Sequence, residues 1–401
     1  MRVLILSSEF PPGPGGLGTH AYHLALNLKR LGWEVLVMTP QDYATDEEIA
    51  KHNQSVPFEI IRLRSASDPL SKAVSRCLLV SKRIRHWRPD AVIASGNRVV
   101  WMASYLAAYH RVLLLAVGHG AEFGIKKRWE QYLTRRSFNA ADAVVCVSNY
   151  TWKQMLSAGI KPRCGQVVPN GADANQFTVL SSAEIDDFRR GLGFENARLL
   201  LTVGNVTDRK GQSIVIRALP HVLSKVPNTH YLIAGLPTKE AELRRLAGEL
   251  NVAEHVHFFG SVSSDVLVKL LNCCDLFVMT SRHSEDGDFE GYGIAVLEAA
   301  LCGKPAVVSF NSGLAEAVVN GETGLCVPEG DHRATAQAIL QLIENKSELE
   351  KLGEVARQRA RQAQTWEHRI RDYDLLLRRL SESSAIAPLA QLPPRVNPFQ
   401  S

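Results

Sequence analysis

Two short stretches in the second half of the sequence combine residue types that bind phosphates and sugar hydroxyls. The first, VGNVTDRKGQS, contains Arg209 and Lys210 beside a glycine and just before an expected helix. Arginine offers a planar fork of donors and lysine a point charge, so the pair suits a diphosphate and the charge that develops on it as it leaves. Taken alone, the same pair also fits a solvated surface.

The second stretch is SEDGDFEGYGIAVLEAALCGKPAV, in which Gly291 and Gly293 open an expected helix. Glu290 precedes that helix and Glu298 lies inside it, eight residues further on. This spacing lets two carboxylates reach different parts of one elongated ligand, and carboxylates accept hydrogen bonds from paired hydroxyls on a sugar or a ribose. For Glu298 alone, a partly buried helix carboxylate with a local partner is an equal alternative.

The stretch EFPPGPGGLGTH near the start fits the G-x-G-x-x-G pattern of a dinucleotide loop. Pro11 and Pro12 separate these glycines from the expected strand, and the next strand ends at Pro40 without the acidic residue that binds a ribose. An NAD-dependent oxidoreductase is therefore disfavoured. The glycines still allow backbone N–H groups to approach an anion at the start of the following helix, with a plain strand-to-helix connection as the alternative.

These residues need elements to position them, and short apolar runs alternate with helical patterns along the whole chain. Such alternation is typical of βαβ units, so the expected fold class is α/β with parallel sheets. Strands are expected near 2–7, 34–38, 57–62, 90–94, 111–117, 142–147, 165–168, 198–203, 229–234, 255–259, 275–279, 305–309 and 324–327. Helices are expected near 17–31, 70–87, 98–109, 127–140, 150–157, 345–363 and 366–380.

The length of 401 residues exceeds one ordinary core and predicts two domains. We expect an N-terminal domain over 1–175 and a C-terminal domain over 176–363, with the helix near 366–380 packing back on the first. Residues 381–401 are rich in Pro and Ser without a period, and we expect them to be a disordered tail.

The composition is that of an ordinary globular protein, with 45% hydrophobic and 22% charged residues. A formal net charge of +5 does not demand a nucleic-acid partner, and no apolar run is long enough for a membrane span. Seven cysteines without a C-x-x-C pair suggest reduced thiols, so neither disulfides nor a metal site are expected. Together with the absence of a signal-peptide pattern, this predicts a cytoplasmic protein.

The segment SKAVSRCLLVSKRIRHWR, residues 71–88, has apolar side chains on one side of an expected helix and cations on the other. A basic amphipathic helix can lie on an anionic membrane, so peripheral contact with the inner face of the cell membrane is one hypothesis. The alternative is an ordinary surface helix docked on the sheet.

This combination of motifs resembles the retaining glycosyltransferases of family 4, which have the GT-B fold of two Rossmann-like domains facing each other across a cleft. The resemblance extends to about Leu380 and depends on the order and spacing of several motifs together. Besides the glycine loop these are GHGAE at 118–122, VSNYT at 147–151, VPNGAD at 168–173, RKG at 209–211, EGYGIAVLE at 290–298 and SGLAEAVVNGETGLCV at 312–327.

The resemblance implies a nucleotide-diphosphate sugar as donor and assigns it four candidate catalytic residues. Arg209 and Lys210 would bind the diphosphate, Glu290 would hold hydroxyls of the donor sugar, and His119 would donate a hydrogen bond near the anomeric carbon. For His119, a buried structural histidine is the alternative. Further donor contacts implied by the family come from two glycines, a ribose-binding carboxylate and the residues around them: Gly15, Gly16, Asn205, Gly291, Tyr292, Gly293, Ile294 and Glu298.

Three positions depart from the family pattern or suggest a different one. Asn205 stands where an arginine is frequent, so phosphate binding depends on Arg209 and Lys210. Ser312 stands in a loop where Gly-Gly is common, which leaves the role of Glu316 open. The sequence Asp286-Gly287-Asp288 spells the D-x-D of metal-dependent transferases, which have another fold, and no metal or other cofactor is expected.

The expected activity is transfer of a hexose-type sugar from a GDP- or UDP-linked donor to a hydroxyl of a glycan, lipid-linked or small-molecule acceptor. The family retains anomeric configuration, through attack on the face from which the leaving group departs, with the leaving phosphate taking the acceptor proton. An epimerase or hydrolase of the same fold and a noncatalytic sugar-nucleotide binding subunit remain alternatives. The sequence does not indicate an oligomeric state.

Overall fold

The computed structural model describes residues 1–13, 15–40, 44–63 and 68–383. Pro14 of the glycine loop and the tail expected beyond residue 383 lie outside these residues. The chain forms two compact units, one of Met1–Asn170 together with the chain from Trp366 onward, the other of Gly171–Thr365. Each unit is described by itself below.

The N-terminal unit is built on a seven-stranded parallel sheet in the order β3-β2-β1-β4-β5-β6-β7. Its central strands are apolar throughout and buried on both faces, as parallel strands covered by helices require. The strands are β1 (Arg2–Ser7), β2 (Glu34–Pro40), β3 (Glu59–Leu63), β4 (Ala91–Ser95), β5 (Leu113–Gly118), β6 (Ala143–Cys146) and β7 (Gly165–Val167).

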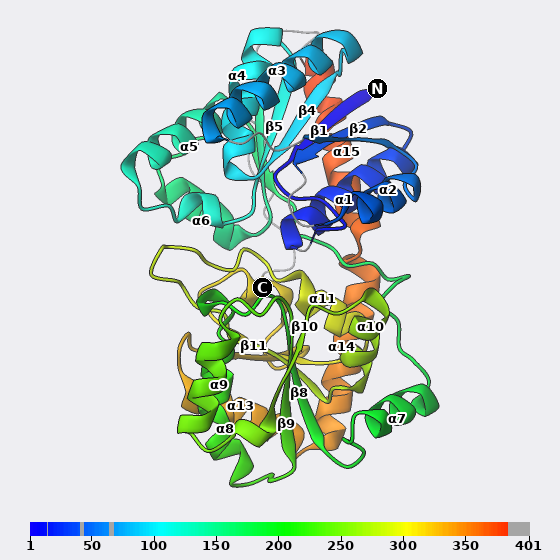
Figure 1. Ribbon diagram of the computed structural model, residues 1–401, viewed down its shortest axis with the longest axis vertical. Helices are drawn as coiled ribbons and strands as arrows, with labels where there is room; N and C mark the ends of the chain where they lie inside the picture. Colours follow the sequence, from blue (N-terminus) through cyan, green and yellow to red (C-terminus); the bar gives the residue numbers. More distant parts are fainter. Residues whose placement is uncertain (14, 41–43, 64–67, 384–401) are drawn as a thin grey trace. The chain divides into compact units, whose positions relative to one another are not determined.

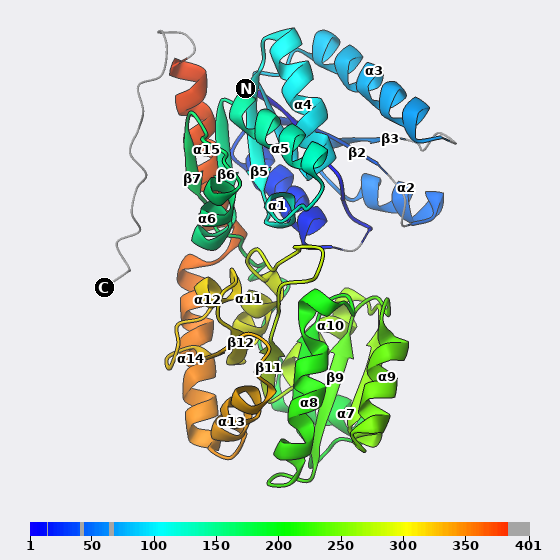
Figure 2. The same ribbon diagram turned by 90° about the vertical axis from the view of Figure 1, so that its left-hand side faces the viewer.

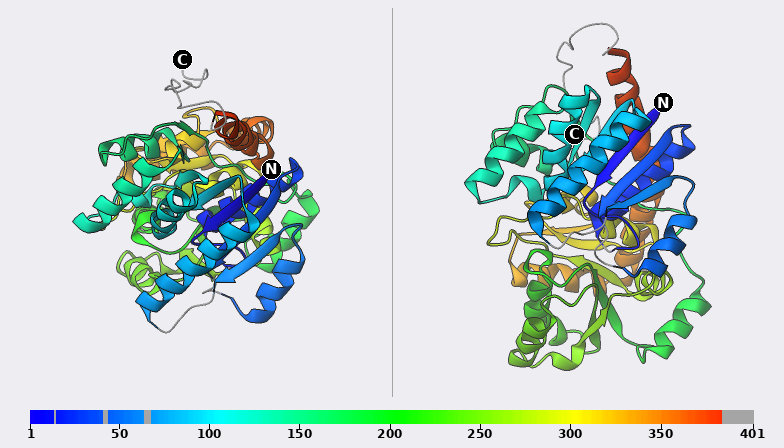
Figure 3. Two further views of the ribbon diagram at one scale, coloured as in Figure 1. Left: turned by 90° about the horizontal axis from the view of Figure 1, so that it is seen from above. Right: turned by 45° about the horizontal axis from the view of Figure 1, so that its top comes forward.

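Helices cover both faces of this sheet (Figure 1). They are α1 (Gly16–Arg30), α2 (Asp46–Gln54), α3 (Pro69–Trp87), α4 (Asn97–His110), η1 (Ala121–Phe123), α5 (Arg128–Ala140), α6 (Asn149–Ser157) and α15 (Trp366–Ser383). Helices α3, α4 and α5 are successive neighbours, and α1 packs against α15 (Figures 1 and 3). The last helix of the chain is thus part of the N-terminal unit.

The C-terminal unit contains a six-stranded parallel sheet in the order β10-β9-β8-β11-β12-β13 (Figure 2). Its strands are β8 (Arg198–Val203), β9 (Thr229–Ala234), β10 (Val256–Gly260), β11 (Leu276–Met279), β12 (Ala306–Ser309) and β13 (Gly324–Val327). Its helices are α7 (Ser182–Gly191), η2 (Asp208–Lys210), α8 (Gln212–Leu223), α9 (Glu240–Glu249), η3 (Ala253–His255), α10 (Ser264–Cys273), α11 (Ile294–Leu301), α12 (Leu314–Ala317), α13 (His332–Ile343) and α14 (Lys346–Ala363).

In both sheets the strand order reverses beside the first strand, between β1 and β4 and between β8 and β11. In such doubly wound sheets, ligands bind outside the carboxyl ends of the strands at this switch point. The loop after β8 carries Arg209 and Lys210, and the loop after β11 carries Glu290. The topology therefore brings together the two stretches that suggested phosphate and sugar chemistry.

Helix α2 is an element that the apolar pattern did not predict. Ile49 is its only residue classed as buried, so its sequence lacks the repeating apolar face of a core helix. A capping box starts it instead: the Thr45 side chain accepts from the backbone of Glu48, whose side chain accepts in return from the Thr45 backbone.

Candidate active site

The C-terminal unit holds a cluster of four charged side chains after β8 and β11. Nζ of Lys210 lies 2.7 Å from Oε2 of Glu290, and the Arg209 guanidinium contacts the same oxygen. Nε of Arg209 also lies 2.9 Å from Oδ2 of Asp288. Two cations and two carboxylates thus balance in charge, and both cations contact Glu290 through Oε2, so neither occupies Oε1.

The short turn that carries the two cations is fixed by Arg282, which follows β11. The backbone N–H of Arg282 donates to the carbonyl of Arg209 over 2.8 Å, and its Nε donates to the carbonyl of Asp208 over 3.1 Å. Lys239 forms an ion pair with the Asp208 carboxylate from the other side. These contacts fix the backbone conformation of the turn, so Arg209 and Lys210 are positioned before any ligand binds.

Burial and charge compete at Glu290, which is only 8% exposed. Burial acts to raise the pKa of this carboxyl, but the charges of Arg209 and Lys210 and their hydrogen bonds outweigh it and lower the pKa to about 2. The Glu290 charge in turn raises the pKa of Arg209, whereas burial lowers the pKa of Lys210 against the opposing effect of Glu290. Glu290 is therefore ionised at neutral pH.

Helix α11 begins directly after this cluster, with Gly293 as its N-cap at φ 84°, a conformation that favours glycine. The preceding loop is held by close backbone approach: a Cβ on Gly313 would lie 1.8 Å from the carbonyl oxygen of Gly291, and the Gly313 N–H donates to the Glu290 carbonyl over 3.0 Å. The positive end of the helix dipole and Ile294, its first residue, therefore lie beside the charged cluster.

Glu298 lies inside α11, about one helical turn after Ile294, and its side chain is half-buried. Burial raises the pKa of this carboxyl to about 7, with Lys210 acting in the opposite direction. In the described part of the chain no hydrogen bond to the Glu298 carboxylate is found, so the local partner considered from sequence is not there. Such a carboxyl is suited to accept hydroxyl donors from a ligand.

Two further predicted donor contacts, Asn205 and Tyr292, lie in the same loops. Asn205 follows β8, and its backbone carbonyl accepts from Nε2 of Gln212 over 3.2 Å. The Tyr292 side chain is 2% exposed and lies in the turn before α11. Any direct ligand contact from these two positions remains a prediction.

The two carboxylates of Asp286-Gly287-Asp288 have different surroundings. Asp286 is exposed, whereas Asp288 is committed to Arg209. Throughout the described ranges, no group of three or more His, Cys, Asp or Glu side chains is arranged to hold a metal ion.

His119 lies in the N-terminal unit, just after β5 and next to the end of β4. Its Nε2 is 2.8 Å from Oγ of Ser95, and its backbone N–H and that of Gly120 both donate to Oε2 of Glu122, over 3.1 and 2.8 Å. Burial lowers the pKa of His119 to about 4, so the imidazole is neutral at neutral pH. A neutral ring has one donor and one acceptor nitrogen, which suits the predicted hydrogen bond to a substrate.

The glycine loop ends where α1 begins, with Gly15 as N-cap and Gly16 as the first helical residue. At φ 132° Gly15 adopts a conformation rare for other residues, and a Cβ there would lie 2.3 Å from Oε2 of Glu9. A carboxylate thus already lies against this helix N-terminus. A donor phosphate at Gly15 and Gly16 remains a prediction.

Comparisons with known proteins identify the family of the chain. Residues 184–359 match the family model described as Glycosyl transferases group 1, and residues 14–176 match the model described as Glycosyltransferase Family 4. A GDP-mannose-dependent alpha-(1-6)-phosphatidylinositol monomannoside mannosyltransferase of Mycolicibacterium smegmatis is 32% identical over 379 residues, covering 92% of this chain and 96% of that protein. The chain belongs to glycosyltransferase family 4.

Other relatives are consistent with this membership. A glycogen synthase of Mycobacterium tuberculosis is 28% identical over 390 residues, covering 92% of either chain. The crystal structure of Anabaena HepE in complex with UDP-glucose has a TM-score of 0.80 at 22% identity, covering 94% of this chain and all of that one. The fold is therefore GT-B, with two Rossmann-like domains, and this glycosyltransferase has the α/β class expected from its sequence.

Several residues of this glycosyltransferase make contacts that its sequence did not predict. Arg282 supports the cationic turn, Asp288 pairs with Arg209, and Ser95 and Glu122 hold His119. Glu122 carried a signal as the last residue of GHGAE, and Asp288 as the second carboxylate of Asp286-Gly287-Asp288, but neither was assigned to the partner that it has in the structure. The others become visible once the strand order is known, because each lies on a strand or loop distant in sequence from its partner.

Proposed function

We propose that this protein is a retaining hexosyltransferase that uses a GDP- or UDP-linked hexose as donor. The observation that carries the proposal is the cluster of Arg209, Lys210 and Glu290 at the switch point of the C-terminal unit. Names of relatives support the donor class, since one mannosyltransferase is described as GDP-mannose-dependent and Anabaena HepE was crystallised with UDP-glucose.

The cluster can bind a diphosphate leaving group if one side chain, that of Asp288, turns away from Arg209. We infer that a donor phosphate replaces the Asp288 carboxylate on Arg209, because this carboxylate is 42% exposed and can turn to solvent. Lys210 and Arg209 then stabilise the charge that develops on the departing diphosphate. The positive end of α11, at Gly291 and Gly293, adds to that stabilisation.

Glu290 can act on both the cations and the donor sugar. Its Oε2 orients Arg209 and Lys210, while Oε1 is used by neither and is available to accept sugar hydroxyls. We do not assign Glu290 as a nucleophile. Glu298 accepts the ribose hydroxyls, and His119 donates a hydrogen bond near the anomeric carbon. The acceptor hydroxyl attacks from the face of departure and gives its proton to the leaving phosphate.

The proposal is tested by following release of the nucleoside diphosphate with and without acceptor, using glycans and lipid-linked sugars as acceptors. Release that requires an acceptor supports the transferase, and equal release without one indicates hydrolysis. Lys210→Met should remove the activity while the exposed helix variant Arg245→Ala keeps it. If Lys210→Met stays fully active, the diphosphate site is wrongly assigned.

We further propose that the acceptor is lipid-linked and is reached by peripheral contact with an anionic membrane on the cytoplasmic side. No helix among the described residues is both long and apolar enough to span a membrane. Helix α3 nevertheless presents Leu78 and Leu79 to solvent, 65% and 50% exposed, and neighbouring α4 presents Tyr105 and Tyr109, 71% and 73% exposed. Exposed apolar and aromatic side chains beside cations are typical of interfacial contact.

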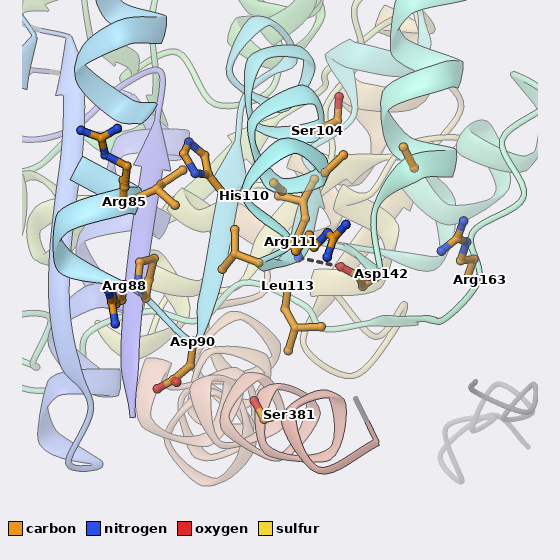
Figure 4. Close-up of a pocket in the computed structure, with 17 residues that line it drawn as sticks. Arg85, Arg88, Asp90, Ser104, His110, Arg111, Leu113, Asp142, Arg163 and Ser381 are labelled. Carbon is orange, nitrogen blue, oxygen red and sulfur yellow. Dashed lines mark hydrogen bonds between the residues drawn. The ribbon is translucent and has the colours of Figure 1, made fainter. Parts of the chain in front are cut away.

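A cavity of about 910 Å³ borders these two helices at the amino ends of β4 and β5 (Figure 4). Figure 4 shows Arg85 and Arg88 on one side of it, Arg163 on the other, and Arg111 between them. Its lining carboxylates are engaged by backbone: Asp90 accepts from the Arg2 N–H and Asp142 from the Leu114 N–H. The arginines are exposed and suit anionic lipid headgroups.

Sedimentation with vesicles tests the membrane contact. The protein should sediment with vesicles containing phosphatidylglycerol at low salt and not with pure phosphatidylcholine, because the attraction depends on lipid charge. The pair Leu78→Ser and Leu79→Ser should reduce binding, whereas Leu375→Ser, an equally exposed leucine on α15, should not. Absence of binding to anionic vesicles would remove this part of the proposal.

The seven free thiols support a reducing, cytoplasmic environment.

A further inference from the structure

The N-terminal unit contains a chain of polar contacts that leads from the last helix to His119. His20, on α1, is 1% exposed, and its ring centroid lies 4.9 Å from that of His119 at an interplanar angle of 82°. Nε2 of His20 is 3.0 Å from the hydroxyl of Tyr373 on α15, and Nε2 of His119 is 2.8 Å from Oγ of Ser95. Four elements distant in sequence thus meet around two imidazoles.

Hydrophobic packing alone does not explain an imidazole at position 20. Nδ1 of His20 is buried without a hydrogen-bond partner among the residues that the structure describes. Leaving a buried polar nitrogen unpaired costs free energy that a leucine or phenylalanine in the same space would not cost. The free-energy cost of this unpaired nitrogen indicates that the imidazole of His20 has a role besides packing.

The surrounding rings fix His20 firmly. Its ring lies against Trp366 and Tyr373, with centroids 5.8 and 5.7 Å away, and both residues are 1% exposed on α15. Trp366 also stacks on His23 of α1, at 5.0 Å and 8°. Burial, followed by the neighbouring histidines His119 and His23, lowers the pKa of His20 well below its usual range, so the ring is neutral.

We propose that His20 is a positioning residue for His119, and that the Tyr373 hydroxyl holds His20 in the required orientation. The edge-to-face contact limits rotation of the His119 ring, and Ser95 binds its Nε2 from the other side. When the Ser95 hydroxyl donates to Nε2, the ring proton of neutral His119 lies on Nδ1, which becomes the donor. The inference rests on the proposed function, in which His119 contacts the donor sugar.

The first test is Tyr373→Phe, which removes one hydroxyl and keeps the packed ring. Loss of a neutral hydrogen bond that holds a positioning residue should lower kcat about fivefold, with the donor KM within about twofold of wild type because the diphosphate site is untouched. The matched control is Tyr231→Phe in the C-terminal unit, an equally buried tyrosine whose hydroxyl lies 2.7 Å from Oγ1 of Thr202. This control should keep kcat. Equal losses in both variants would overturn the proposal.

A double-mutant cycle separates positioning from a general structural effect. If Tyr373 acts through His119, adding Tyr373→Phe to His119→Ala should cause no further loss of kcat. The same fivefold loss in both backgrounds would show that Tyr373 does not act through His119. Thermal unfolding of each variant verifies that all four proteins remain folded.

A measurement without substrate tests the positioning even if the proposed function fails. In protein labelled with nitrogen-15 histidine, the side-chain NMR shifts of His119 report which ring nitrogen carries the proton. The expected result is one tautomer in the wild type and an average of both in Tyr373→Phe, with the Tyr231→Phe spectrum unchanged. His119 signals identical in Tyr373→Phe and wild type would refute the positioning role, whereas a response in a protein without transferase activity would refute only the proposed function.

Discussion

Lys210 and Glu290 are separated by 80 residues in the chain, yet Nζ of the lysine lies 2.7 Å from Oε2 of the glutamate. Strands β8 and β11 are neighbours at the switch point of the sheet, and this adjacency creates the contact. The two residues are therefore coupled, and in the proposed function the carboxylate orients the cation that stabilises the leaving diphosphate.

Lys210→Met removes a cation that stabilises the departing phosphate, and Glu290→Gln removes the carboxylate that orients Arg209 and Lys210, so each should lower kcat about 100-fold or more. The double variant should be little worse than the worse single variant, because groups that act together lose their effect together. Steady-state kinetics at saturating donor provide the measurement.

Arg245→Ala is the control, because Arg245 forms an exposed ion pair with Glu249 on α9. Such pairs contribute little to stability, and this one has no contact with the cluster. Fully additive losses in the double variant of Lys210 and Glu290 would show that the two side chains work independently.

Asp288→Asn should strengthen donor binding. The Asp288 carboxylate lies 2.9 Å from Nε of Arg209 and competes with the incoming diphosphate for that guanidinium. Removing its charge should lower the donor KM by about threefold to tenfold, a difference of about 1 kcal/mol. Asp286→Asn on the same loop is the matched control and should change KM little, because Asp286 is exposed. A raised KM in Asp288→Asn would mean that this carboxylate assists binding.

Donor affinity should depend on pH through Glu298. Burial raises its pKa to about 7 in the free protein, and the ionised form is the better acceptor of ribose hydroxyls. The dissociation constant of an intact nucleotide sugar should therefore rise about tenfold between pH 8 and pH 6. Calorimetric titration of wild type and Glu298→Gln measures this, and the variant should show no such slope. A wild-type affinity independent of pH would exclude the ribose role.

The raised pKa of Glu298 also makes the stability of the folded protein depend on pH. The folded-state pKa of Glu298 lies above the usual carboxyl value of 4.5, so its ionisation disfavours the folded state. Its contribution to stability is fully present below pH 4.5 and is lost as the pH rises towards 7. Denaturant unfolding of wild type and Glu298→Gln should differ in pH dependence within that window, and parallel curves would contradict the assignment.

The elements that could be predicted from sequence are those with an apolar period. The strands around Leu200 and Ile233 and the helix containing Leu24 and Leu28 were expected within a few residues of their observed bounds. Helix α2 was missed because Ile49 alone is buried there, and its signal was the capping box formed by Thr45 and Glu48.

The sequence indicated which side chains belong to the candidate site but not which of them contact one another. Side-chain types indicated that Arg209 and Lys210 would serve a phosphate, while their pairing with Glu290 depends on which strands are neighbours. The contact of His20 with Tyr373, 353 residues away, depends on the last helix packing against the first, and no local pattern indicates it.

The most direct test of the central claim is a thermal-shift comparison of GDP- and UDP-linked hexoses on wild type and Lys210→Met, with NAD as the unrelated dinucleotide. A ligand present at about 100 times its dissociation constant stabilises the folded state by about 2.7 kcal/mol, which is readily detected. At least one nucleotide hexose should raise the melting temperature of the wild type, with the shift lost in Lys210→Met and absent with NAD. A nucleotide-hexose shift that is the same in both proteins, or no shift with any GDP- or UDP-linked hexose, would contradict a donor site at Arg209, Lys210 and Glu290.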